Sequence, residues 1–315
     1  MRIFWAGFLL FFILSCSKDD SVVSDVDTTI TTWLATMNND SATRDDSGVY
    51  YYATVENTTG TPVTTGSVVS IFYTLSDLEG NVIASHQRTD GDSLQLKQGV
   101  SAVFPIGLDV GLAFMNEGET FQMILPPSQA YQELTSGAID RSLIALLEVE
   151  VVSVMDEATV FNQELLDIDN YILAENLNDT LDVPLNTVEQ FPSGLSFKRL
   201  EKGFGELGVN GETIIVNYTA TFLDGTEFDA KQNFQYILGS SEPRLLIPGF
   251  DFGVSLMKPL ERSLLMIPSS QAYIESAFVL PSSITEDLVA DAIIPEYVIR
   301  VGPYKTLLFD VTRFN

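Results

Sequence analysis

The chain has 315 residues, a length that suits about two domains, and 45% of them are hydrophobic, enough for a packed core. Its 43 acidic and 16 basic residues give a formal net charge of −27, which excludes nucleic acid as a partner because phosphate binding needs a basic surface. A single cysteine excludes a disulfide framework, and a single histidine, His86, excludes a histidine-rich metal site.

The first residues have the pattern of a secretory signal. Arg2 precedes an apolar run from Ile3 to Leu14, which is too short to cross a bilayer as a helix. The run ends in ILSC, with Cys16 last, and resembles the lipobox of bacterial lipoproteins, whose cysteine is lipidated and becomes the mature N-terminus. The resemblance implies lipidation at Cys16 and attachment to a membrane through that lipid. A signal peptide with an incidental cysteine is the alternative.

The residues after Cys16 bear on the compartment. No aspartate follows the cysteine directly, so nothing resembles an inner-membrane retention signal. The run Lys18-Asp19-Asp20 resembles a surface-export signal of lipoproteins in some gram-negative bacteria. We therefore expect a lipoprotein of the cell envelope, in the outer membrane, that faces the periplasm or the cell surface. A plain solvated tether is the alternative interpretation of the charged run.

An amphipathic helix is predicted twice in the rest of the chain. Apolar residues recur at helical spacing in Ile30, Trp33, Leu34 and Met37, and again in Phe161, Leu165, Ile168 and Ile172. Each such helix precedes one copy of a repeated unit and must bury its apolar stripe.

The repeated unit is recognised from segments at nearly constant offset. Leu125–Tyr131 (LPPSQAY) matches Ile267–Tyr273 (IPSSQAY) 142 residues later, and Val68–Thr74 matches Thr213–Thr219 at an offset of 145. Several matches in the same order indicate a tandem duplication.

Each copy has the pattern of a small α+β domain. Four β-like runs are predicted in the first copy, Tyr50–Val55, Val68–Leu75, Thr120–Leu125 and Ala145–Val154, and Gly249–Met257 of the second has helical spacing. We therefore predict an antiparallel sheet with one short helix against it in each copy.

One motif in the second copy imitates a dinucleotide site. Gly203–Gly208 spells G-x-G-x-x-G, but that fingerprint requires a helix directly after the glycines. A β-like run, Thr213–Phe222, follows instead, so the segment is predicted to be a hairpin loop and no cofactor is expected.

The second copy also carries an ordered set of motifs. They are Tyr218, Leu223-Asp224-Gly225, Phe228-Asp229, Phe234-x-Tyr236-x-Leu238-Gly239, Ile247-x-Gly249-Phe250, Pro268, Ala272-Tyr273 and Leu307–Val311. In this order they resemble the FKBP-type peptidyl-prolyl cis-trans isomerases, well over residues 193–315 and more weakly over residues 45–156. The resemblance implies that each copy is a sheet curled around a short helix, with a pocket between them.

The resemblance also implies the site residues. It assigns catalytic roles to Tyr218, Phe228, Asp229 and Tyr273, and a substrate pocket to Phe234, Tyr236, Ile247, Phe250 and Phe309. Two departures stand out. The family usually has a tryptophan on the pocket floor, where this chain has Phe250. It often has an arginine in the loop after the Phe-Asp pair, where this chain offers only Lys231.

The residue types fit the chemistry that the resemblance implies. Rotation about a peptide bond costs ~18–20 kcal/mol but breaks no bond, so it needs no nucleophile, metal or cofactor. An apolar pocket disfavours the charge separation of the planar amide, and a thousandfold acceleration requires only ~4 kcal/mol. Tyr273 would donate to a substrate carbonyl, and Tyr218 would donate to Asp229, which is otherwise costly to bury.

The first copy lacks most of this site. Tyr73 and Tyr131 remain, but the Phe-Asp position has Ile83-Ala84. Leu108 replaces the floor residue Phe250, Phe104 or Pro105 replaces Ile247, and Leu147 replaces Phe309. We predict that the first copy is an inactive spacer or a binding module.

The second copy contains an insertion. Tyr273 and Phe309 are 36 residues apart, whereas Tyr131 and Leu147 are 16 apart. In the family that the chain resembles, this loop overhangs the pocket. We therefore predict a lid that narrows the site or covers it.

Five segments are predicted: a lipoprotein signal peptide over 1–15, a lipidated tether with a short helix over 16–44, a degenerate FKBP-like domain over 45–156, a helical connector over 157–192, and an FKBP-like isomerase domain over 193–315. The predicted function is a membrane-anchored, cofactor-independent peptidyl-prolyl cis-trans isomerase. It would assist the folding of proline-containing unfolded or exported polypeptides, with activity in the second domain only. A non-catalytic FKBP-like chaperone or protein-binding lipoprotein is the alternative.

Overall fold

The computed structural model describes residues 20–134, 139–178, 187–240, 246–274 and 276–315. The chain divides into two compact units, residues 1–42 and residues 43–315. The first unit contains helix α1 (Asp20–Thr36), which agrees with the amphipathic helix predicted around Ile30. None of the helices within the described ranges is long and apolar enough to span a bilayer. Cys16, the predicted lipidation site, lies outside the described residues.

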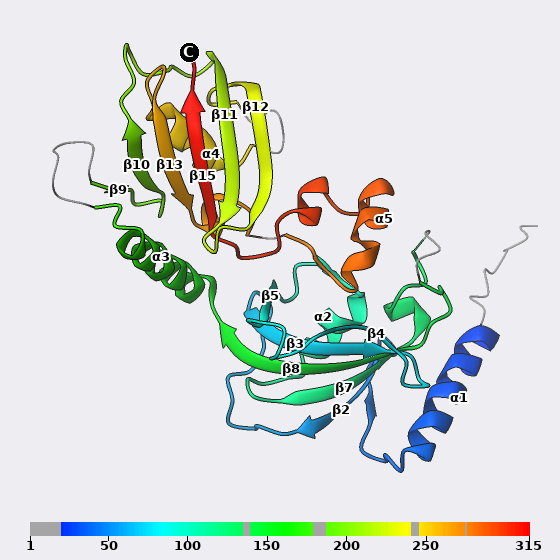
Figure 1. Cartoon of the computed structure of the whole chain (residues 1–315). Coiled ribbons are helices and arrows are strands. Elements are labelled where there is room, and N and C mark those ends of the chain that lie inside the picture. Colours follow the sequence, from blue (N-terminus) through cyan, green and yellow to red (C-terminus); the bar gives the residue numbers. More distant parts are fainter. Residues whose placement is uncertain (1–19, 135–138, 179–186, 241–245, 275) are drawn as a thin grey trace, which may run out of the picture. The chain divides into compact units, whose positions relative to one another are not determined.

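The second unit contains two large antiparallel sheets, each with its own helix (Figure 1). The first sheet consists of β1 (Thr43–Arg44), β2 (Tyr50–Val55), β7 (Thr120–Leu125), β8 (Ala145–Met155), β3 (Val68–Ser76) and β4 (Val82–His86) in that spatial order, with β5 (Leu94–Lys97) also paired to β3. The same domain contains β6 (Val103–Phe104), α2 (Ile106–Leu112) and the 3₁₀ turn η1 (Pro127–Gln129). The four strands predicted for this copy are present as β2, β3, β7 and β8.

The second sheet repeats this arrangement. Its order is β12 (Glu227–Ile237), β11 (Thr213–Phe222), β15 (Leu307–Arg313), β13 (Arg262–Ile267), β10 (Ser196–Glu201) and β9 (Glu189–Gln190). Helix α4 (Pro248–Ser255) is followed by β13 and then by the 3₁₀ turn η2 (Ser269–Gln271). Strand β11 follows the Gly203–Gly208 segment where a dinucleotide site would need a helix. The predicted fold, two tandem α+β domains with antiparallel sheets, is confirmed.

The short helix of each domain lies close against its sheet. Glycines in the helix face β7 or β13, and a Cβ on Gly111 would lie 2.3 Å from Met123 Sδ. A Cβ on Gly253 would lie 2.6 Å from Leu265 Cδ1. Because no larger residue fits without displacement, these glycines set how closely each helix approaches its sheet.

Helix α3 (Glu157–Ala174) connects the two domains and is fastened to the second. Its buried residues recur at every fourth position: Val160, Glu164, Ile168 and Ile172. Ile168 and Ile172 share a cluster with Leu264, Met266 and Leu308 of β13 and β15. The predicted amphipathic helix is thus present, although its buried stripe includes a glutamate.

The insertion of the second domain folds into short elements. These are β14 (Phe278–Val279), η3 (Ser282–Ile284), α5 (Thr285–Ala290) and η4 (Glu296–Ile299). The predicted lid accounts for only part of it, because β14 pairs with β6 of the first domain. Its last part lines a pocket of the second domain.

Candidate active site

The second domain contains a pocket of about 330 Å³, a volume typical of small-ligand sites. Eight of the residues predicted for the site line it: Tyr218, Phe228, Asp229, Phe234, Ile247, Phe250, Tyr273 and Phe309. Lys231 and Leu246 line it as well, together with Glu296, Tyr297, Arg300 and Val301 from the insertion. Tyr236, the ninth predicted residue, is buried beside the pocket with its ring stacked on Phe234 at 5.8 Å.

Strand register explains why these side chains meet. Ala220 of β11 pairs with Asp229 of β12 on one side and with Phe309 of β15 on the other. Directly opposed residues in a sheet point to the same face, so the carboxylate and the ring flank a small, fully buried alanine. Tyr218 lies two residues earlier in β11 and therefore points to that face too.

The pocket interior is a cluster of aromatic rings. The ring centroid of Tyr218 lies 5.4 Å from that of Phe250, 5.6 Å from that of Phe309 and 5.9 Å from that of Phe234. Phe250 and Phe309 meet edge to face at 5.1 Å. These geometries are the favoured ones for aromatic pairs. They produce an apolar wall that can receive a saturated ring.

Asp229 places a carboxylate beside these rings, and it is held from two sides. Tyr218 Oη donates to its Oδ2 at 2.7 Å, which is the predicted hydrogen bond. Arg300 Nη1 donates to its Oδ1 at 3.0 Å. Burial, followed by the hydrogen bond to Asp229, raises the pKa of Tyr218 above its usual value. Tyr218 therefore keeps its proton, and the pair forms a rigid polar element.

Arg300 is a site residue that no motif in the sequence indicates. It lies in the insertion, 71 residues from Asp229 along the chain. The only signal was indirect: the loop after the Phe-Asp pair lacks the arginine that is usual in the family. The second domain contains other arginines, so the sequence could not indicate which one would reach Asp229.

Tyr273 lines the pocket beside a second tyrosine from the insertion. Its ring stacks on Tyr297, with centroids 4.4 Å apart and planes inclined by 19°. Burial, with a smaller contribution from Tyr297, raises the pKa of Tyr273 to about 12. The hydroxyl is therefore a neutral hydrogen-bond donor at physiological pH.

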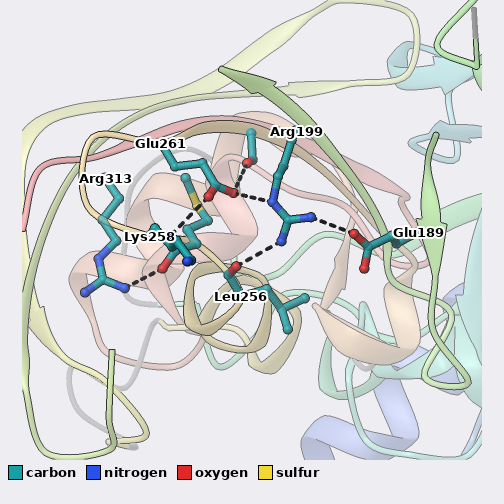
Figure 2. Close-up of polar contacts among 8 residues, drawn as sticks. Glu189, Arg199, Leu256, Lys258, Glu261 and Arg313 are labelled. Atoms are coloured by element: carbon teal, nitrogen blue, oxygen red, sulfur yellow. Dashed lines mark hydrogen bonds and ion pairs between the residues drawn. The ribbon is translucent and has the colours of Figure 1, made fainter. Parts of the chain in front are cut away.

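Two arginines stabilise the end of the helix that carries Phe250 (Figure 2). Arg199 Nη2 donates to the Leu256 carbonyl at 3.3 Å, and Arg313 Nη1 donates to the Met257 carbonyl at 2.6 Å. Arg199 also pairs with the buried Glu261 at 3.1 Å. Because cations stabilise helix C-termini, this network holds α4 and the pocket floor against the sheet.

The described part of the chain contains no cluster of histidine, cysteine, aspartate and glutamate residues that could hold a metal ion. The pocket offers apolar walls, two carboxylates that pair with Arg300 (Asp229 and the more exposed Glu296) and a hydroxyl donor. This arrangement suits binding and reorientation of a peptide segment.

The corresponding face of the first domain has the same frame and different side chains. Ala84 pairs with Leu75 as Asp229 pairs with Ala220. Pro105 is the residue before α2, where Ile247 precedes α4. The Asp229 carboxylate has no counterpart here.

An antiparallel sheet, a short helix against it and an aromatic pocket define the class of domain found here. Two segments of the chain, residues 60–152 and 206–312, match the family described as FKBP-type peptidyl-prolyl cis-trans isomerase. Together they cover more than half of the chain, which therefore belongs to this family.

Several curated bacterial proteins are similar to the chain. The peptidyl-prolyl cis-trans isomerase Mip of Chlamydia trachomatis is 27% identical over 151 residues, 46% of this chain and 60% of that protein. The FK506-binding protein of Neisseria meningitidis is 36% identical over 84 residues, 25% of this chain and 74% of that protein. The isomerase FkpA of Escherichia coli is 36% identical over 91 residues, 27% of this chain and 32% of that protein. The matches thus span less than two thirds of Mip and FkpA.

Solved structures that match the chain, with low TM-scores, include the three FKBP domains of wheat FKBP73. This match has 17% identity and a TM-score of 0.31, and covers 86% of this chain and 95% of that one. Escherichia coli FkpA matches with 23% identity and a TM-score of 0.33, over 50% of this chain and 63% of that one.

Proposed function

We propose that this chain is a peptidyl-prolyl cis-trans isomerase whose activity lies in the second domain alone. The observation that supports this most directly is the Asp229 carboxylate, held between Tyr218 and Arg300 in an aromatic pocket. The first domain has alanine at that position.

In the proposed reaction the proline ring enters the space between Phe228, Phe250 and Phe309. Uncatalysed isomerisation takes ~10–100 s because the planar amide is stabilised by charge-separated resonance. Apolar walls solvate that charge separation poorly, whereas the twisted amide has lost it. The twisted form is thus bound better than the planar forms, which is what accelerates a reaction.

The polar groups have separate roles in this proposal. Tyr273 donates its hydroxyl to a substrate carbonyl and orients the peptide. The charge of Asp229 is balanced by Arg300 and its second oxygen accepts from Tyr218, so both carboxylate oxygens have a partner in the wall. Phe234 and Ile247 complete the surface that contacts the proline ring, and Tyr236 packs against Phe234.

The substrates we propose are proline-containing unfolded or exported polypeptides, met at a membrane to which the protein is attached through lipidated Cys16. The apolar run before the chain's single cysteine supports this. The proposed domain scheme keeps the segments 1–15, 16–44, 45–156, 157–192 and 193–315, with the protein in the cell envelope at the outer membrane.

A protease-coupled assay on proline tetrapeptides tests the activity. We expect the full chain to accelerate isomerisation and Tyr273→Phe to lower kcat/KM by about fivefold, the effect of losing one neutral hydrogen bond. The matched control is Tyr131→Phe at the equivalent position of the first domain. The Tyr131 hydroxyl is buried and has no hydrogen-bond partner within the described residues, so its loss should leave the rate unchanged.

Equal losses in the two variants would contradict the assignment of activity to the second domain. A wild-type chain that prevents aggregation of unfolded protein but does not accelerate isomerisation would support a non-catalytic chaperone instead.

A further inference from the structure

The insertion of the second domain is anchored to the main chain of the first. Phe278 and Val279 pair in parallel with Val103 and Phe104. The Phe278 amide donates to the Ala102 carbonyl and the Leu280 amide to the Phe104 carbonyl, both at 2.8 Å. A strand added to an existing backbone in this way has a defined register.

The side chains of the insertion are buried in the core of the first domain. Phe278 and Leu280 are 6% and 2% exposed, and Ile284 and Leu288 are fully buried. They belong to the same cluster as the first-domain residues Leu108, Tyr131 and Leu147. These three stand at the positions that form the pocket floor, the hydroxyl donor and the wall in the second domain. The degenerate site of the first domain therefore contributes to the core that holds the insertion.

The same insertion then returns to the pocket of the second domain. The Ile293 amide donates to the Leu288 carbonyl at 2.9 Å, which closes the turn that leads to η4. Tyr297 of η4 stacks on Tyr273, and Arg300 pairs with Asp229. Only eight residues separate Leu288, in the first-domain core, from Tyr297, in the pocket.

The far end of the insertion is held as well. Tyr304 is buried in a cluster with Val68 of the first domain and Val160 of α3. Its hydroxyl donates to Glu157 Oε1 at 3.3 Å, and Glu157 pairs with Lys97 of β5 at 3.0 Å.

We infer that the first domain is a positioning partner of the second domain's pocket: by holding residues 278–288 it fixes Tyr297 and Arg300 around the bound peptide. The inference rests on the proposed isomerase function. If the insertion were not held, fixing Tyr297 and Arg300 at the pocket would cost the conformational entropy of ordering the loop. It explains why the first copy keeps its fold and its apolar face without the residues of the reaction.

The test uses the full chain with Ile284→Asp, which places a charge in the shared core and should release the insertion. Ile293→Asp is the matched control, because Ile293 lies in the same insertion and is 52% exposed. Hydrogen exchange of the Phe278 and Leu280 amides reports release. Ile284→Ala is the milder variant if the aspartate prevents the first domain from folding.

We expect release to lower kcat/KM about tenfold, the effect of losing one charge-assisted hydrogen bond in the pocket. Arg300→Ala should give a similar loss, and the double variant should lose no more than either single variant. The loss should also differ among peptides that vary before the proline, because Tyr297 would no longer line the site. A purely structural effect would change every peptide equally.

Faster exchange at Phe278 and Leu280 with wild-type kcat/KM for every peptide would overturn the inference and leave the proposed function intact. A wild-type chain without isomerase activity would instead overturn the proposed function. In that case exchange of the Tyr297 and Arg300 amides decides: protection that is lost in Ile284→Asp supports positioning, and unchanged protection overturns it.

Discussion

The two domains differ most sharply in one row of three residues across the sheet. In the second domain a small residue, Ala220, lies between Asp229 and Phe309. In the first domain a large one, Leu75, lies between Ala84 and Leu147. Alanine and aspartate are exchanged for leucine at the centre and alanine at one edge, while the third residue is large in both domains. The first-domain face is also covered by side chains of the insertion. A pocket can therefore be gained or lost within an unchanged sheet.

The residues that hold the frame are retained in both domains. Glu119 and Glu261 occupy equivalent buried positions after the short helix and accept the backbone N–H of Asn116 at 2.7 Å and of Lys258 at 3.2 Å. A buried carboxylate needs such partners, which makes this contact part of the fold in both copies. The comparison separates residues needed to fold from those needed for the pocket.

The most damaging test of this comparison is Ala220→Leu, which gives the second domain the central residue of the first. We expect kcat/KM to fall by at least about a hundredfold because the side chain fills the space for the proline ring, whereas overpacking costs stability only about 1–3 kcal/mol. The assay is the tetrapeptide isomerisation, with urea unfolding to confirm the fold.

Thr219→Leu is the matched control, since Thr219 is exposed on the other face of β11. It should leave kcat/KM near the wild-type value. If Ala220→Leu also has the wild-type kcat/KM, Ala220 does not border the peptide, and the central residue of the row does not explain why only the second domain has this pocket.

The regular elements could be predicted because their signals are local. The strands β2 and β7 follow from their β-type composition and turn boundaries, and the ordered motifs around Phe228-Asp229 identified the pocket of the second domain. Arg300 could not be assigned to Asp229, because their contact depends on how a long insertion folds.

Burial of the insertion in the first domain was equally hidden. Apolar residues such as Phe278 and Leu280 predict that the loop is buried, but only the structure shows that the first-domain core buries them. Glu164 gave no signal either, because a glutamate at a buried helix position runs against the apolar pattern used to predict the stripe.

Glu164 provides a second, smaller difference between the domains. It accepts hydrogen bonds from the backbone N–H and the hydroxyl of Ser269, both at 2.9 Å. The equivalent residue of the first domain is Pro127, which has neither donor. Only the second domain can therefore receive this carboxylate.

Burial raises the pKa of Glu164 above its ordinary value, despite the hydrogen bonds from Ser269 and Thr306. The folded chain then binds the proton more tightly than the unfolded chain. This tighter proton binding at Glu164 adds to the free energy of unfolding. The addition is complete below the usual glutamate pKa of about 4.3 and is lost as the pH rises through the raised pKa. The glutamine of Glu164→Gln stays neutral, so we expect the stability of this variant not to fall with pH for this reason.

Urea midpoints measured for the wild type and for Glu164→Gln between about pH 4 and pH 7 check this. The difference in favour of the glutamine variant should grow as the pH rises. Gln163→Glu, one residue earlier on an exposed position, is the control and should not show that trend. A pH-independent difference would mean that Glu164 titrates alike in the folded and unfolded chains.

The smallest expected effect concerns Tyr273 and its counterpart Tyr131. Burial raises the pKa of both hydroxyls, but Tyr273 lines the pocket of the second domain whereas Tyr131 is fully buried in the first-domain core. Since its pKa is about 12, Tyr273 remains a donor where an ordinary tyrosine, with a pKa of about 10, is half ionised. We therefore expect kcat/KM to stay level from neutral pH to about pH 10 and to fall only above it.

Exchange spectroscopy on a proline peptide measures this profile without a coupling protease. Tyr131→Phe should reproduce the wild-type profile, whereas Tyr273→Phe should be lower and should not fall further at high pH. Tyr297→Leu removes a neighbour that raises the pKa of Tyr273, so the fall should then begin at a lower pH. A wild-type midpoint near the ordinary tyrosine pKa would show that Tyr273 is well hydrated, which contradicts a dry pocket and with it the proposed basis of the acceleration.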